Sequence, residues 1–184
     1  MMRPMENRQC GFSVVELMVT VTVVAILAAV AVPSFVGMVN TNRLAAQSNE
    51  LLSAIQYART EAVRTNSRVT FCGVDSETAS SVADCDDGEQ PFWAVIGPAA
   101  GGGQEQLRLF SVREPLKVSS ELDMISFTPD GMARDPVTRQ LIAGDITVCV
   151  ETSNPPQNKR LVSIASGSRV VISKPDEDGE GSCE

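Results

Sequence analysis

The longest apolar segment of the chain lies close to its start. It runs for 21 residues, from Phe12 to Val32, and contains one charged side chain, Glu16. A helix of this length spans about 31 Å at roughly 1.5 Å per residue, which matches a hydrocarbon core of roughly 30 Å. The pattern therefore predicts a single transmembrane helix over residues 12–33.

Two arginines before this run orient the predicted helix. Arg3 and Arg8 lie in residues 1–11, a short polar segment that directly precedes the apolar run. The positive-inside rule keeps such a segment in the cytoplasm. Everything after Pro33 is then expected on the outer side of the membrane.

The charge inside the apolar run calls for a partner. A carboxylate at membrane depth costs several kcal/mol unless it is neutralised, so a lone intramembrane Glu is a functional hypothesis. If the chain is cut between Gly11 and Phe12, the new α-amine lies one helical turn from Glu16. We therefore predict that Glu16 is an assembly residue that pairs with the Phe12 amine of its own chain or of a neighbour.

The helical pattern continues beyond Pro33. Proline removes a backbone donor and clashes with the carbonyl of Ala29, so we expect the helix to bend or loosen there. Apolar and small residues then recur at helical spacing, at Leu44, Ser48, Leu51, Ile55, Ala58 and Ala62. Residues 34–66 are therefore predicted to form an amphipathic helix that packs one face on a sheet.

From Val69 onward the period changes to short β-rich runs. Most gaps between the runs contain Pro, Gly, Asp or Asn, which is typical of antiparallel strands; the runs are 69–71, 92–96, 107–110, 125–127, 146–150, 161–164 and 169–172. Residues 67–184 are therefore predicted to form a β-rich head domain. The expected fold class is α+β, a long N-terminal helix of about fifty residues packed on an antiparallel sheet.

Charge and composition exclude several functions. Residues 67–184 contain 10 Lys and Arg against 19 Asp and Glu, a net charge of −9, which disfavours a phosphate-binding surface. The chain contains no His, the commonest general base and metal ligand. We therefore expect no catalytic residue, no metal and no cofactor.

One acidic cluster resembles a calcium loop only superficially. An EF-hand loop needs Gly at its sixth position and Glu at its twelfth. Counted from Asp84, those positions hold Glu89 and Val95. We expect this segment, and the acidic run 176–180, to be solvated loops.

Cysteine usage indicates an extracytoplasmic head. Cys10 would leave with residues 1–11, and the four other cysteines show no C-x-x-C spacing. Four cysteines allow three pairings. We favour Cys72 with Cys85, which closes a loop across an acidic segment, and Cys149 with Cys183, which tethers a polar tail.

Several motifs resemble those of one family. Residues 11–17, Gly-Phe-Ser-Val-Val-Glu-Leu, look like the type III signal of type IV pilins and type II secretion pseudopilins, and Pro33 lies where pilins carry a helix-bending proline. Three further segments, 42–51, 58–62 and 69–72, are similar to the FimT and pseudopilin H branch of minor subunits.

The resemblance implies a pilin fold and a sequence of processing and assembly steps. It implies that a prepilin peptidase removes residues 1–11 as a leader and N-methylates Phe12. It also implies an inner-membrane protein with a periplasmic head. The inner-membrane assembly platform would add this protein to other pilins or pseudopilins, and the resulting filament would carry it to the cell surface. A type IV pilus and a type II secretion filament remain equally open.

Two rival functions stay open from the sequence. Some FimT-like proteins are DNA receptors with a Gly-Arg-x-Arg turn, where this chain has residues 167–170, Gly-Ser-Arg-Val. Arg160, Arg169 and Lys174 are the candidate DNA contacts, although the acidic head makes nucleic-acid binding an unfavoured alternative. The other rival is a soluble periplasmic domain, released by signal peptidase at an A-x-A site over residues 29–31.

Overall fold

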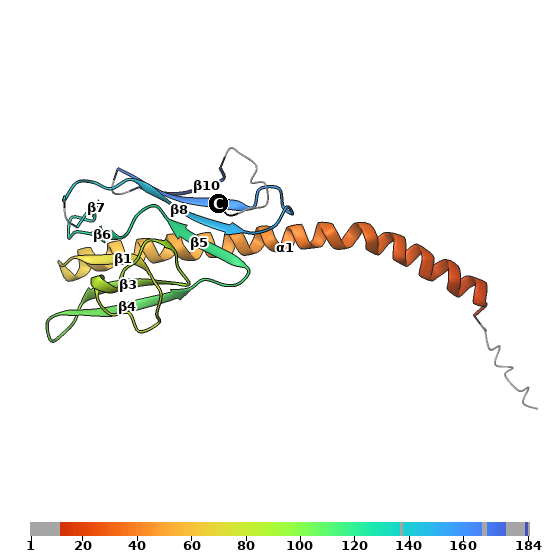
Figure 1. Cartoon of the computed structure of the whole chain (residues 1–184), viewed down its shortest axis with the longest axis horizontal. Helices are drawn as coiled ribbons and strands as arrows, with labels where there is room; N and C mark the ends of the chain where they lie inside the picture. Colours follow the sequence, from red (N-terminus) through yellow and green to blue (C-terminus); the bar gives the residue numbers. More distant parts are fainter. Residues whose placement is uncertain (1–11, 137, 167–168, 176–182, 184) are drawn as a thin grey trace, which may run out of the picture.

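The structure, a computed structural model, has one long helix and a head of two β-sheets. It describes residues 12–136, 138–166, 169–175 and 183. Figure 1 shows the two sheets beside the second half of helix α1 (Val14–Thr65), while the first half of α1 projects away from the head. The α+β class predicted from the sequence is confirmed.

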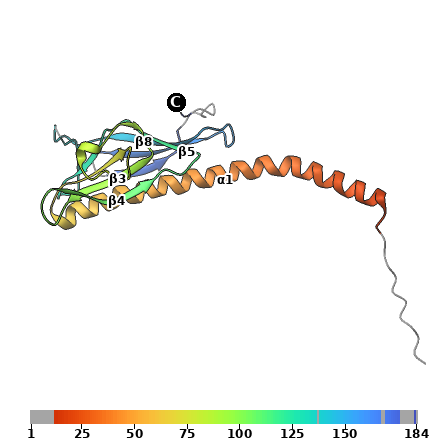
Figure 2. The ribbon, with the colours of Figure 1, turned by 60° about the horizontal axis from the view of Figure 1, so that its bottom comes forward.

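Helix α1 runs unbroken through Pro33. Because proline lacks an N–H, the carbonyl of Ala29 loses its helical donor, and such a site is a normal cause of helix bending. Figure 2 shows the first half of α1 curving away from the line of the half that packs on the head. The helix ends at Thr65, and the following residue, Asn66, caps it with a left-handed backbone (φ 49°) and an N–H that bonds to the last turn.

The first sheet, sheet A, packs near the end of α1. Its strands pair antiparallel in the order β4-β3-β1-β6-β7. Their bounds are β1 Val69–Val74, β3 Phe92–Pro98, β4 Gln104–Ser111, β6 Ile125–Phe127 and β7 Ala133–Arg134. A short 3-10 helix, η1 (Val82–Asp84), lies between β1 and β3 along the chain.

The second sheet, sheet B, is also antiparallel, in the order β10-β9-β8-β5-β2. Its strands are β2 Gly88–Glu89, β5 Leu116–Ser120, β8 Gly144–Val150, β9 Lys159–Ala165 and β10 Arg169–Ser173. Helix α1 contacts strands of both sheets, so one helix face joins the two halves of the head.

The predicted stripe of α1 forms the centre of the core. Five of its six members are fully buried apolar residues, Leu44, Leu51, Ile55, Ala58 and Ala62. They pack with side chains from both sheets, including Phe71 and Trp93, whose rings stack with centroids 5.3 Å apart. Burial of each large aliphatic side chain stabilises the head by about 1.5–3 kcal/mol.

A second apolar cluster covers the other face of sheet A. Residues 75–87 fold back over that face, and the cluster includes Cys72, Val74, Ala79, Ala94 and Ile96. The side-chain Oε1 of Gln104 accepts the N–H of Val82 at 2.9 Å, which fastens the segment to β4. Strand β1 is therefore buried on both faces.

Two disulfides close the head, and they are the two pairs favoured from the sequence. Cys72 bonds to Cys85 and Cys149 bonds to Cys183, with Cα–Cα distances of 5.6 Å in both cases. The first holds residues 75–87 against sheet A. The second fixes Cys183 to β8, beside Lys117 and Lys159 of the neighbouring strands.

Removal of either disulfide is expected to destabilise the head. In the chain-entropy account, the bonds close segments of 13 and 34 residues and contribute about 3 and 4 kcal/mol to the free energy of unfolding. Cys72→Ser with Cys85→Ser, and Cys149→Ser with Cys183→Ser, should lower the urea midpoint followed by Trp93 fluorescence. An unchanged midpoint in either double variant would contradict this expectation for that disulfide.

Candidate functional site

The first half of α1 presents an apolar surface that nothing in the head covers. By length and composition this part of the helix could cross a membrane, and its most apolar stretch is not buried at all. Large apolar side chains from Phe12 to Met38 are 44–74% exposed, far more than a soluble monomer normally leaves uncovered. This surface therefore requires lipid or other apolar helices around it.

Two threonines of this segment donate hydrogen bonds to their own helix. Thr20 Oγ1 donates to the carbonyl of Leu17 at 2.9 Å, and Thr22 Oγ1 donates to the carbonyl of Met18 at 2.8 Å. Such bonds to the preceding turn let hydroxyl groups lie in an apolar medium at little cost.

Glu16 has no such partner. It lies in the first turn of α1, and its carboxylate makes no hydrogen bond or ion pair within the described part of the chain. Ser13 precedes the helix without a side-chain cap, so the first-turn N–H groups form a positive end beside this carboxylate. The geometry leaves Glu16 available to a cation from outside its own helix.

The predicted cleavage site lies at the edge of the described chain. Phe12 lies before the start of the helix and is 71% exposed, which suits a junction that a protease must reach. Gly11 lies outside the described residues, as do residues 1–10. Pairing of Glu16 with the Phe12 amine therefore remains a prediction.

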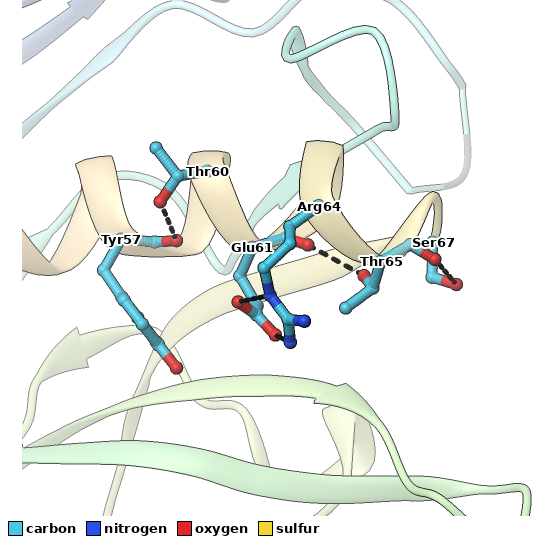
Figure 3. Close-up of polar contacts among 6 residues, drawn as sticks. All are labelled: Tyr57, Thr60, Glu61, Arg64, Thr65 and Ser67. Carbon is cyan, nitrogen blue, oxygen red and sulfur yellow. Dashed lines mark hydrogen bonds and ion pairs between the residues drawn. The ribbon is translucent and has the colours of Figure 1, made fainter.

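A polar cluster fixes the other end of α1 (Figure 3). Arg64 Nε donates to Glu61 Oε2 at 2.9 Å, and this bond holds the pKa of the Glu61 carboxyl below its ordinary value even though burial acts in the opposite direction. Thr65 Oγ1 donates to the Glu61 carbonyl at 2.8 Å, and Ser67 Oγ donates to the Thr65 carbonyl at 3.1 Å. This cluster was not predicted from the sequence, although Glu and Arg three residues apart on a helix are a signal for such a pair.

Beside this cluster, Arg108 of β4 lies over the ring of Tyr57, with its Cζ 4.8 Å from the ring centroid. A guanidinium at this distance attracts the face of an aromatic ring. Figure 3 shows Tyr57 pointing from the helix toward the strands below it, on the same side as Glu61. These contacts orient the last turns of α1 on sheet A.

The candidate DNA contacts do not form one surface. Arg160 is only 6% exposed, and its Nη1 donates to the carbonyls of Lys159 at 2.7 Å and Gln157 at 3.3 Å. Burial lowers the pKa of this guanidinium. Along β9 every second side chain is buried, and Arg160 lies on the same inward face as Val162 and Ile164. This position corrects the prediction that Arg160 is a candidate DNA contact.

Arg169 and Lys174 are both exposed, but they lie at opposite ends of edge strand β10. Arg169 pairs with Ala165 at one end, and Lys174 follows Ser173 at the other. They are five positions apart, roughly 16 Å along an extended chain, so they do not form a cluster. Gly167 and Ser168 of the compared turn lie outside the described residues.

Within the acidic segment, Asp84 accepts hydrogen bonds from the backbone of the same segment. Asp84 Oδ2 accepts the N–H groups of Ser80 and Ser81, both at 2.9 Å, and these bonds lower the pKa of the Asp84 carboxyl. Among the residues that the structure describes, no three His, Cys, Asp or Glu lie together as a metal site. The run 176–180 lies outside that part of the chain.

Two sequence profiles match the chain. The profile described as Type II transport protein GspH matches residues 47–174, and the one described as Prokaryotic N-terminal methylation motif matches residues 7–32. The first covers the second half of α1 and nearly all of the head, and the second covers the apolar run with Glu16. No curated protein sequence matches this chain.

Solved structures share the fold. A crystal structure of the type IV minor pilin FimU of Pseudomonas aeruginosa is 18% identical with a TM-score of 0.54, and covers 76% of this chain and 95% of that one. The minor pseudopilin EpsH of the Vibrio cholerae type 2 secretion system is 10% identical with a TM-score of 0.51, over 73% of this chain and 99% of that one. At these identities the likeness concerns the fold.

Proposed function

Because the chain belongs to the type II transport protein GspH family, we propose that it is a minor pilin or pseudopilin, a structural subunit of a type IV pilus or a type II secretion filament. One observation carries the proposal. An exposed apolar helix long enough to cross a membrane holds one carboxylate, Glu16, that has no partner in its own described chain. The role is structural, without a catalytic residue.

The proposal divides the chain by environment. Residues 1–11 are a leader that prepilin peptidase removes, residues 12–33 lie in the inner membrane and later in the filament core, and residues 34–66 carry the helix into the head. Residues 67–184 form the periplasmic head. Arg3 and Arg8 support this orientation, with the leader in the cytoplasm.

Assembly then follows from the charge in the helix. Cleavage between Gly11 and Phe12 creates an amine, and the carboxylate of Glu16 on a neighbouring subunit neutralises it. Pairing removes the cost of two isolated charges in an apolar surrounding, so a subunit in correct axial register is favoured over a misplaced one. The inner-membrane assembly platform would present the subunit, and the apolar helices would bundle inside the filament.

The proposal is tested by where the mature chain is found. An epitope-tagged chain should appear in filaments sheared from cells that overproduce pili or secretion filaments. Only one of two deletions, that of the pilus ATPase or that of the secretion ATPase, should remove the tagged chain from the sheared fraction. The deletion that removes it identifies the system. Its absence from both kinds of filament, with other minor subunits present, would contradict the proposal.

The arrangement of basic residues disfavours the DNA-receptor alternative. With Arg160 buried and the head at −9, we expect the detergent-solubilised chain to bind duplex DNA more weakly than about 1 µM in roughly 0.15 M salt. A gel-shift titration measures this. Sub-micromolar binding that is lost in Arg169→Ala, but kept in the exposed control Arg68→Ala, would instead make DNA uptake the leading function.

A further inference from the structure

The loop between β8 and β9 extends along the helix as far as Pro33. Asn154 Nδ2 donates to the carbonyl of Pro33 at 2.6 Å, and Asn40 Nδ2 donates to the carbonyl of Asn154 at 3.0 Å. Thr152 Oγ1 accepts the N–H of Asn154 at 3.1 Å and so holds the loop in shape. We call Pro33, Gly37, Asn40 and Asn154 the clasp.

Gly37 makes the close approach of this loop possible. It is buried although it lies on the otherwise exposed part of α1, and an added Cβ would lie 2.4 Å from Asn154 Oδ1 and 3.1 Å from Asn154 Cγ. Such distances are shorter than van der Waals contact, so a larger residue would displace the loop. Glycine lowers the stability of a helix interior, and here the cost is offset by contact with the head.

The clasp lies between the weakest turn of α1 and the core. Pro33 leaves the carbonyl of Ala29 without its helical donor, which weakens the turn between them. Leu44 is the first residue of α1 that is fully buried in the core, and residues 41–43 are half-buried or exposed. Without the clasp the head would hold the helix only from Leu44 on, about 16 Å further from the membrane than Pro33.

We propose that the clasp confines bending of the anchor to the single turn between Ala29 and Pro33 and thereby sets the direction in which the membrane half leaves the head. Asn154 and Gly37 are then positioning residues, which act on assembly through the helix. This confinement is a property of the isolated chain. Only its consequence for filaments rests on the proposed function.

Hydrogen exchange of the full chain in detergent tests the confinement. In Asn154→Ala, amide exchange over residues 37–43 should accelerate about tenfold, since two bonds to the head are lost or weakened, while exchange over residues 51–62 stays unchanged. The matched control is Asn49→Ala, because Asn49 bonds only to the carbonyl of Ala45 in its own helix. Unchanged exchange over residues 37–43, or equal acceleration over residues 51–62, would overturn the proposal.

A covalent lock tests the role in assembly. The contact distance of Gly37 to Asn154 allows a disulfide in Gly37→Cys with Asn154→Cys, and peptide mapping would verify it. The locked chain should enter filaments at the wild-type level, whereas Asn154→Ala should enter several-fold less and still insert in the membrane. A locked chain that enters filaments only after reduction would show that the clasp must open, against the proposal. If the wild-type chain enters no filament, the proposed function fails while the exchange result stands.

Discussion

Glu16→Val is expected to leave the chain in the membrane and to reduce its incorporation into filaments at least about tenfold. Insertion should be unchanged or stronger, because the substitution replaces a carboxylate, which is unfavourable in an apolar medium, by an apolar side chain. Incorporation should fall because the Phe12 amine of a neighbour loses its counter-charge inside the bundle. Breaking a buried pair from one side costs about 3–5 kcal/mol, which is more than a tenfold change requires.

Membrane fractionation and immunoblots of sheared filaments measure the two effects separately. Thr20→Val is the matched control, since Thr20 lies one turn further along the same run and bonds only to the carbonyl of Leu17. Wild-type recovery of Glu16→Val in filaments would show that the pairing role is wrong. Equal loss in Thr20→Val would point to apolar packing rather than to charge.

Gly11→Val is expected to keep residues 1–11 on the chain and to abolish incorporation almost completely. Without cleavage no amine forms at Phe12, so the neighbour's Glu16 has no cation to meet, and a polar leader remains at the end of the bundle. Intact mass of the membrane-extracted wild-type chain should correspond to a start at Phe12 with one added methyl group. The same measurement on the variant should give the full-length chain.

The rival cleavage after Ala31 would give a different N-terminus and a different location of the product. A wild-type chain that begins at Val32, found in the soluble periplasmic fraction, would refute the membrane anchor and with it the filament role. Ala31→Leu serves as the control, because it spoils the A-x-A site and preserves the apolar run. Its mass should match the start at Phe12.

The helix could be predicted nearly to its ends because its signals are long. The apolar run and the stripe predicted helix over residues 12–66, and α1 spans Val14–Thr65. Strand β5 (Leu116–Ser120) was missed because only Leu116 and Val118 mark it as apolar, and β2 and β7 are two residues long. Such short segments become strands through their neighbours rather than through their own sequence.

Contacts between distant segments were beyond the sequence pattern. The sequence offers Arg160 as a candidate DNA contact, and only the register of β9 against β8 shows that its side chain is buried. The clasp joins Asn154 to Pro33 across 121 positions, and no local pattern links an Asn-Pro turn to a helix so far away. Glu16, by contrast, was recognisable at once, because its signal is a charge where the surrounding run permits none.

The continuity of α1 has a mechanical consequence. A filament under tension pulls each subunit along the axis of this helix, and the same helix carries Leu44, Leu51 and Ile55 into the centre of the head. Because α1 contacts strands of both sheets, the force acts in shear on the whole interface at once instead of peeling one strand after another. The head should therefore resist unfolding when it is pulled through α1. A single-molecule pulling experiment should show one high rupture force rather than a series of small ones.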